Sequence, residues 1–144
     1  MEQSNLQLAS DLRSAVTLLF KKLRKKSATG QGLSLTERST LGLLSVHKQL
    51  LPNELAAMEH ITTQSMSQVL NYLLELGYIT RTMSQEDKRK AIIALSPEGE
   101  AMIEKMRSER DEWLNKAIRE SCTPEEQEAL IKLIKPLTKL IDFD

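Results

Sequence analysis

The sequence lacks the features that disulfide-bonded, secreted and membrane-spanning proteins need. Its one cysteine, Cys122, has no partner for a disulfide within the chain. No apolar run approaches the roughly 20 residues that cross a bilayer. The first residues, MEQSNLQLASDLR, lack the basic-then-apolar order of a signal peptide. These absences predict a cytoplasmic protein without a membrane partner. The 144 residues, 40% of them hydrophobic, suffice for one domain with a buried core.

Signatures of catalysis and of metal binding are also absent. The sequence contains no G-x-S-x-G, no phosphate-binding loop, no H-E-x-x-H and no cysteine–histidine pair with a supporting acid. His47 and His60 are 13 residues apart and lack the spacing of metal ligands, so we interpret both as structural or surface residues. The sequence therefore predicts no enzyme and neither a bound metal nor a cofactor.

The two ends of the chain differ in charge, although 20 basic and 20 acidic side chains make the whole neutral. Residues 1–96 hold twelve basic and eight acidic side chains, a net charge of +4, and residues 97–144 hold the reverse, a net charge of −4. A basic portion joined to an acidic one suits a protein that presents one end to a polyanion. A solvated charged surface is the alternative explanation.

Apolar residues at helical spacing dominate both ends of the sequence. The first predicted helix covers residues 5–26, and a loop with two glycines follows at 27–33. Another helix begins at Ser96-Pro97 and extends to about Arg119. The capping box of residues 123–126 then opens the last helix. That helix carries an apolar stripe formed by Leu130, Leu133, Leu137 and Leu140.

The middle of the sequence has the order of a winged helix-turn-helix. Thr36 is predicted to cap a helix whose residues Leu35, Leu41 and Leu44 face inward. Pro52 fits the first turn of the next helix.

Thr62 is predicted to cap a further helix, and Gly77 to end it as a left-handed residue. Strands are predicted over residues 78–83 and 91–95, with a charged hairpin loop between them. The predicted fold is mainly α with a small β-hairpin wing. It is one domain over residues 1–144, with the winged helix-turn-helix at 34–96 and helical parts at 1–30 and 97–144.

The most specific motif is Asp87-Lys88-Arg89 in the predicted loop, followed by Ile93-Ala94-Leu95-Ser96-Pro97-Glu98-Gly99. With N-E-L-A at residues 53–56 and L-x-x-L-G-Y-I at 73–79, the sequence resembles the MarR family of bacterial transcription regulators. Its usual signature is a D-x-R wing followed by V-x-L-T-x-x-G. The resemblance covers nearly the whole chain.

The resemblance implies a homodimer whose terminal helices interlock, so that each subunit presents one winged domain to half of a palindromic operator in double-stranded DNA. Residues 62–76 would form the recognition helix, and Arg89 would enter a minor groove while Asp87 holds the loop. Many members release DNA when a small, often phenolic, ligand binds between the dimerisation and DNA-binding regions.

The positions of the residues in the predicted helix and wing, together with the resemblance to the MarR family, indicate a set of residues that would contact DNA. They are Thr62, Thr63, Gln64, Ser65, Ser67, Gln68, Arg81, Lys88, Arg89 and Lys90, with Asp87 supporting the wing. Relatives often carry arginine in the recognition helix, yet residues 61–76 contain neither lysine nor arginine. Gln64 and Gln68 can instead pair with adenine edges. The alternative to DNA contact by these glutamines is an ordinary solvated helix face. For the basic loop, the alternative is likewise a solvated surface.

Other residues are candidates for a ligand pocket or for a redox role. Phe20, Met102, Met106 and Trp113 are candidates to line a pocket for an aromatic or phenolic effector, although methionines are more simply core residues. Cys122 is interpreted as a structural or incidental thiol rather than a redox sensor. The lysine-rich run at 21–26 ends a helix, where cations favour the helix dipole, with phosphate contact as the alternative.

The predicted function is a sequence-specific, DNA-binding transcriptional regulator, a homodimeric repressor that a small molecule releases from DNA. The alternative is a winged-helix protein–protein interaction module that binds no operator, since a fold alone does not determine function. The missing cations in residues 61–76 are the feature that keeps this alternative open.

Overall fold

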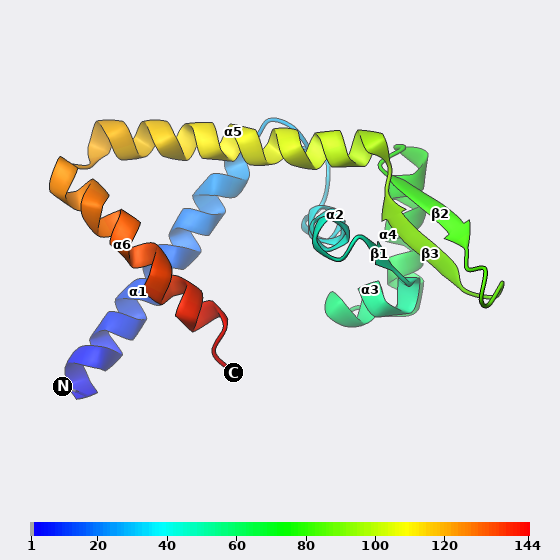
Figure 1. Ribbon diagram of the computed structural model, residues 1–144, viewed down its shortest axis with the longest axis horizontal. Helices are drawn as coiled ribbons and strands as arrows, with labels where there is room; N and C mark the ends of the chain where they lie inside the picture. Colours follow the sequence, from blue (N-terminus) through cyan, green and yellow to red (C-terminus); the bar gives the residue numbers. More distant parts are fainter. Residues whose placement is uncertain (1) are drawn as a thin grey trace. The chain divides into compact units, whose positions relative to one another are not determined.

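The computed structural model describes residues 2–144 (Figure 1). These residues form helices and a three-stranded antiparallel sheet, which confirms the predicted mainly α fold with a small β wing. They divide into two compact units, one made of residues 27–108 and the other of the chain up to Lys26 together with residues 109–144. The elements are α1 (Glu2–Lys25), α2 (Leu35–His47), β1 (Gln49–Leu50), α3 (Pro52–Met58), α4 (Thr63–Glu75), β2 (Ile79–Met83), β3 (Ala91–Leu95), α5 (Pro97–Ser121) and α6 (Pro124–Ile141).

The unit of residues 27–108 is built around a hydrophobic core. Helices α2, α3 and α4, the sheet and the first half of α5 all contribute buried side chains to it. Three residues of α5 belong to this core, namely Met102, Ile103 and Met106. The two compact units divide inside α5, after residue 108. Burial of this α5 face joins it to the winged part.

The sheet has the strand order β1–β3–β2. The hairpin of β2 and β3 pairs Ile79 with Leu95 and Met83 with Ala91 at its two ends, so both predicted strands are confirmed. Strand β1 pairs Gln49 with Ala94 on the other side of β3 and was missed by the sequence analysis. Two residues are too few to show the alternation of apolar and polar side chains that identifies a strand.

The predicted cap of α2 was wrong by two residues. Ser34 is the cap: its Oγ accepts a hydrogen bond from the Glu37 N–H at 3.1 Å, and Glu37 Oε1 accepts one from the Ser34 N–H at 2.9 Å. Thr36 lies inside the first turn, and Leu35, predicted to face inward, is 54% exposed. The S-x-x-E spacing of a capping box was present in the sequence and would have placed the start correctly.

Left-handed residues end both helices of the helix-turn-helix. His60, with φ 56°, follows α3, where the Ile61 N–H donates to the Ala56 carbonyl at 3.0 Å. Gly77, with φ 80°, follows α4, where the Tyr78 N–H donates to the Leu73 carbonyl at 3.1 Å. Both are Schellman turns, in which a left-handed residue reverses the chain. The predicted role of Gly77 is confirmed.

Ser96 connects the end of α4 to the start of α5. Its hydroxyl donates to the Gly77 carbonyl, and its Oγ accepts from the Gly99 N–H at 3.0 Å. Its own N–H donates to the Tyr78 carbonyl at 3.0 Å. These bonds orient the hairpin that leaves α4, and so position the wing relative to that helix.

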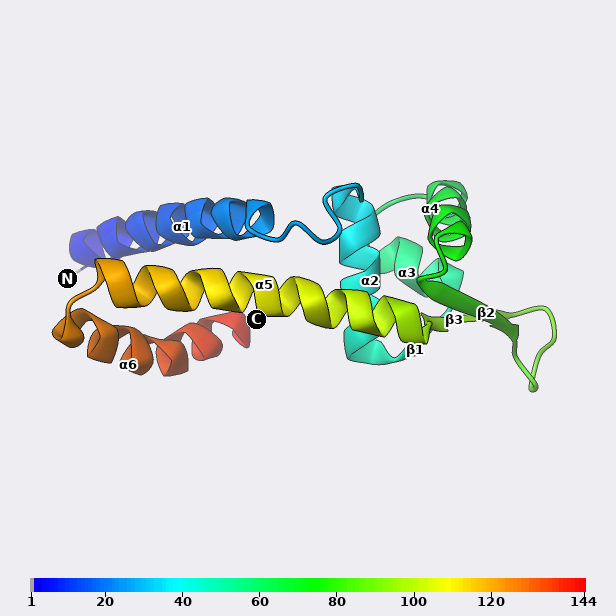
Figure 2. The same cartoon turned by 90° about the horizontal axis from the view of Figure 1, so that it is seen from above.

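The other unit consists of three helical segments. Helices α1 and α6 flank the second half of α5 (Figure 2). Thr123 caps α6 through the predicted capping box with Glu126. Many large apolar side chains of α1 and α6 remain exposed, including Leu6, Leu18, Phe20, Ile131, Ile134 and Ile141. None of the helices described for residues 2–144 is both long enough and apolar enough to cross a membrane.

Candidate nucleic-acid interface

Helix α4 has one buried face and one polar, exposed face. Met66, Leu70 and Leu73 are buried in the core. Gln64 and Gln68, four residues apart, share the opposite, exposed face. All ten residues predicted to contact DNA are exposed and lie on α4, at its cap, on β2 or in the wing loop. The fold thus brings the whole predicted set into the unit of residues 27–108.

The hydroxyl groups at the start of α4 are already used within the helix. Thr62 Oγ1 accepts from the Ser65 N–H at 3.0 Å and donates to Ser65 Oγ at 2.9 Å. The Ser67 hydroxyl donates to the Thr63 carbonyl at 3.0 Å. The helix is therefore capped by its own side chains. The partial positive charge of the helix dipole lies at this N-terminus.

The wing loop, residues 84–90, is held by an internal network of hydrogen bonds. The Ser84 N–H donates to the Lys90 carbonyl and the Lys90 N–H to the Asp87 carbonyl, both at 2.9 Å. Asp87 Oδ1 accepts from the Arg89 N–H at 3.0 Å and from Arg89 Nε at 3.2 Å. The Arg89 side chain is nevertheless 91% exposed. The loop therefore holds the Arg89 guanidinium in a restrained position in which it is exposed to solvent.

Asp87 is held in its charged form by these contacts. Hydrogen bonds from the Arg89 backbone and then from its side chain lower the pKa of Asp87 below the ordinary carboxyl value of 3.8, and the charge of Lys90 lowers it further. The small desolvation at this exposed position acts in the opposite direction. The lowered pKa extends the charged form of Asp87, and with it the contact to Arg89, to lower pH.

A cationic groove of about 350 Å³ lies between α3, α4 and the base of the wing. Arg81, Arg89 and Lys90 line it, and none of its lining residues is acidic. Thr63 and Ser67 form its α4 side. Its remaining lining residues are Leu51, Pro52, Asn53 and Ala91. Three cations beside a helix N-terminus form a surface suited to a phosphate group.

Asn53 was not among the predicted site residues, although it lines the groove. Its Oδ1 accepts from the Glu54 N–H at 3.0 Å, which leaves its amide N–H groups as donors. The N-E-L-A stretch of the sequence contained this residue but indicated only a resemblance. Asn71, exposed on α4 one turn after Gln68, was also not among the predicted site residues.

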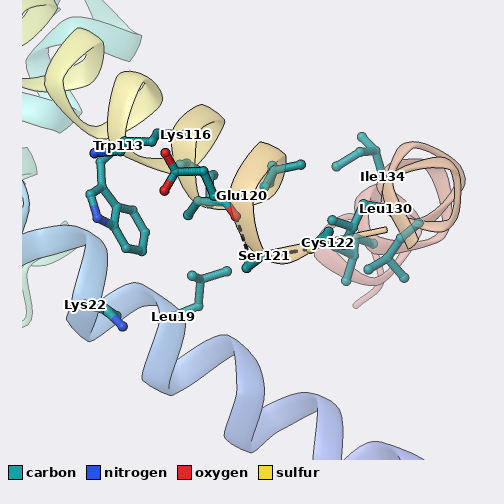
Figure 3. Close-up of a pocket in the computed structure, with 14 residues that line it drawn as sticks. Leu19, Lys22, Trp113, Lys116, Glu120, Ser121, Cys122, Leu130 and Ile134 are labelled. Carbon is teal, nitrogen blue, oxygen red and sulfur yellow. Dashed lines mark hydrogen bonds between the residues drawn. The ribbon is translucent and has the colours of Figure 1, made fainter. Parts of the chain in front are cut away.

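Of the four residues predicted to line a ligand pocket, Met102 and Met106 belong to the unit of residues 27–108, and Phe20 and Trp113 belong to the other unit. Met102 and Met106 lie in the core of residues 27–108. Trp113 lines a cavity of about 830 Å³ formed by α1, α5 and α6 within the other unit (Figure 3). Phe20, 55% exposed on α1, does not line that cavity.

The cavity is mostly apolar and has cations at its aromatic wall. Lys22 Nζ lies 5.6 Å, and Lys26 Nζ 5.3 Å, from the centre of the Trp113 ring. Such distances are typical of cation–π contacts. Cys122 is half-buried at the edge of the cavity, with Sγ 3.8 Å from Ser121 Oγ (Figure 3).

Comparisons with known proteins agree with this architecture. The model of the MarR family matches residues 31–90. An HTH-type transcriptional regulator of Mycobacterium bovis is 32% identical over 114 residues, 79% of each chain. The HTH-type transcriptional repressor YetL of Bacillus subtilis is 32% identical over 110 residues, 75% of this chain and 65% of its own. A crystal structure of a putative transcriptional regulator from Pseudomonas aeruginosa superimposes with a TM-score of 0.84 at 30% identity, covering 97% of this chain and 98% of the other.

Proposed function

Because this chain belongs to the MarR family of transcriptional regulators, we propose that it acts in the cytoplasm as a homodimeric repressor. In this proposal it binds a palindromic operator in double-stranded DNA and leaves it when a small aromatic or phenolic effector binds. The observation that carries the DNA-binding part is the surface shared by α4 and the wing. The polar face of α4 and the cations of the wing and groove belong to one compact unit.

The proposed contacts follow from the shape of this surface. Helix α4 is long enough to lie in a major groove, and the exposed guanidinium of Arg89 extends toward the adjacent minor groove. Lys88 and Lys90 contact phosphates from the wing, and Arg81 does so from the groove. Thr62, Thr63, Ser65 and Ser67 approach the backbone of the duplex at the start of α4.

The homodimer is supported by the apolar residues that one chain leaves exposed. Ile131 and Ile134 on α6 are 67% and 62% exposed, and Leu18 on α1 is 65% exposed. Large apolar side chains gathered on two helices of one unit usually mark an interface. A second copy of the chain would cover them, because an interface of this kind in homodimers is large and apolar.

Two further observations support the proposal that the protein is a repressor and that a small molecule releases it from DNA. The relative YetL is named a repressor. The cavity offers the aromatic wall of Trp113 and two lysines, Lys22 and Lys116, among its lining residues, which suits a small aromatic acid. Benzoate and phenol are suitable probes, and either should release operator DNA from the protein at concentrations that leave the fold intact.

One experiment tests the central proposal. Purified full-length protein is mixed with fragmented genomic DNA at several salt concentrations, and the retained fragments are sequenced. Recovery of a few inverted-repeat sites, with an affinity that falls steeply with salt, is expected. Retention of no fragment even at low salt would contradict the proposal.

That negative result would favour the second candidate, a winged-helix module that binds a protein. The observation behind it is the absence of lysine and arginine from α4, since arginine is the commonest reader of guanine.

A further inference from the structure

We propose that the exposed face of α4 selects adenine–thymine pairs, so that operator half-sites are rich in A·T where this helix lies in the major groove. This inference rests on the proposed DNA-binding function and specifies the class of sequence that it recognises. It is carried by a stripe of carboxamide side chains on α4 and by the location of the cations outside that stripe.

The stripe consists of Gln64, Gln68 and Asn71. Separations of four and three residues place the three side chains on one face of a helix, one above another. All three are exposed, and the face they form lies opposite Met66, Leu70 and Leu73, which are buried. A helix that docks with this face toward a groove floor would direct three amides at base edges.

These amides are not used elsewhere in the described chain. Within residues 2–144, no side-chain hydrogen bond or ion pair involves Gln64, Gln68 or Asn71. The neighbouring hydroxyls of Thr62, Ser65 and Ser67, in contrast, form the hydrogen bonds of the cap and the first turn. The hydroxyls therefore hold the helix end, and the amides keep their donors and acceptors for a partner.

The chemistry of the amide favours adenine. A carboxamide offers one acceptor and a donor side by side, which matches the N6 donor and N7 acceptor of adenine in the major groove. Guanine presents two acceptors there and is read best by arginine or lysine, which α4 lacks. Glu75, the charged residue of α4, lies at its C-terminal end, whereas recognition helices contact bases mainly through their N-terminal residues.

The cations occupy a separate surface. Arg81, Arg89 and Lys90 line the groove at the base of the wing, and Ser67 marks the edge between this groove and the amide stripe. In this arrangement Arg81 and Lys90 hold phosphates, and phosphate contacts carry no direct sequence information. Because the cations and the amides lie on separate surfaces, the amides of α4 are left to select bases in the major groove. In addition, a guanidinium such as Arg89 prefers the narrow minor groove of A-tracts.

The test is selection from a random duplex library by the full-length protein. The unaltered protein should enrich half-sites with consecutive A·T pairs. Gln68→Arg should shift one position of the selected half-site from adenine to guanine, because arginine pairs with the two guanine acceptors. Replacing adenine with 7-deazaadenine at that position, which removes only the N7 acceptor, should weaken binding by about 5- to 150-fold.

Lys88→Ala is the matched control, since loss of a wing cation should weaken all duplexes about equally without altering the selected sequence. Selection of G·C-rich half-sites, or an unchanged selected sequence with Gln68→Arg, would overturn the inference while leaving the proposed DNA binding intact. Recovery of no duplex by the unaltered protein would overturn both.

Discussion

Gly99, in the first turn of α5, lies directly against the backbone carbonyl of Tyr78. A methyl group at Gly99 would come within 2.0 Å of the Tyr78 oxygen, far inside van der Waals contact. The same carbonyl accepts the Ser96 N–H at 3.0 Å, so it cannot move away without breaking that bond. Glycine at this position therefore allows the start of α5 to pack against the chain that enters the wing.

Gly99→Ala should destabilise the fold by about 1–3 kcal/mol, because the added methyl overpacks a backbone contact. Urea denaturation followed by circular dichroism measures the free energy of unfolding. Gly42→Ala is the control: nothing lies within 4 Å of a methyl there, inside α2. That change should stabilise by about 0.5–1 kcal/mol, as alanine favours a helix. Equal effects of the two substitutions would refute the close contact.

His60→Gly should stabilise the winged unit by about 0.5–1 kcal/mol, because its φ of 56° costs a side-chain-bearing residue strain that glycine avoids. The same change at His47, the last residue of α2, should destabilise, since helical backbone disfavours glycine. Thermal unfolding of both variants provides the comparison. A lower melting temperature for His60→Gly would show that its side chain contributes more than the strain costs.

The pKa of Asp87 should lie below 3.8, and Arg89→Ala should raise it part of the way toward that value, because the variant loses the side-chain hydrogen bond and keeps the backbone N–H that is the first cause of the lowering. A carboxylate whose folded pKa is depressed stabilises the fold above its unfolded pKa and loses that contribution as pH falls through the folded pKa. The wing should consequently keep its order from neutral pH down to about pH 4 and loosen only below. Carboxyl carbon shifts measured by NMR across a pH series report this titration. An Asp87 pKa unaffected by Arg89→Ala would contradict the contribution assigned to the Arg89 side chain.

Arg89→Ala should weaken DNA binding by about 1–3 kcal/mol, since a cation in a narrow minor groove meets a strongly negative potential. The salt dependence should also become shallower, because fewer counterions are released. Fluorescence anisotropy over a salt series gives both quantities. Lys132→Ala, which removes an exposed cation of α6 in the other unit, serves as control and should leave binding unchanged. Equal affinities of parent and Arg89→Ala across the series would rule out the wing contact.

Ile134→Glu should dissociate the proposed dimer, because it would bury a charge in an apolar interface. If the protein were a monomer, Ile134 would be 62% exposed, so Ile134→Glu would change the stability of the fold very little. Light scattering during size exclusion measures the mass. Lys132→Glu, at an exposed position of the same helix, is the control. Removal of residues 130–144 should likewise leave an aggregated or unfolded chain, and a soluble, cooperatively folding monomer would count against the dimer.

Much of the site could be read from local sequence signals. Thr62 as a cap, Gly77 as a left-handed terminator and the 84–90 loop between two strands depend on hydrogen bonds and backbone preferences within a few residues. The exposed positions Gln64 and Gln68 follow from helical periodicity alone. These features were predictable because each is determined by residues next to it in the chain.

Other features depended on contacts between distant segments. Strand β1 exists because Gln49 and Leu50 meet β3, some 40 residues later. The cationic groove joins Asn53, Ser67 and Arg81 from three elements, so no local pattern indicates it. Met102, Met106 and Trp113 lie on one helix, yet packing buries the methionines in one unit and places the tryptophan at a cavity of the other. The sequence by itself determined the elements and their exposed chemistry, and only tertiary packing decided which side chains share a core, a groove or a cavity.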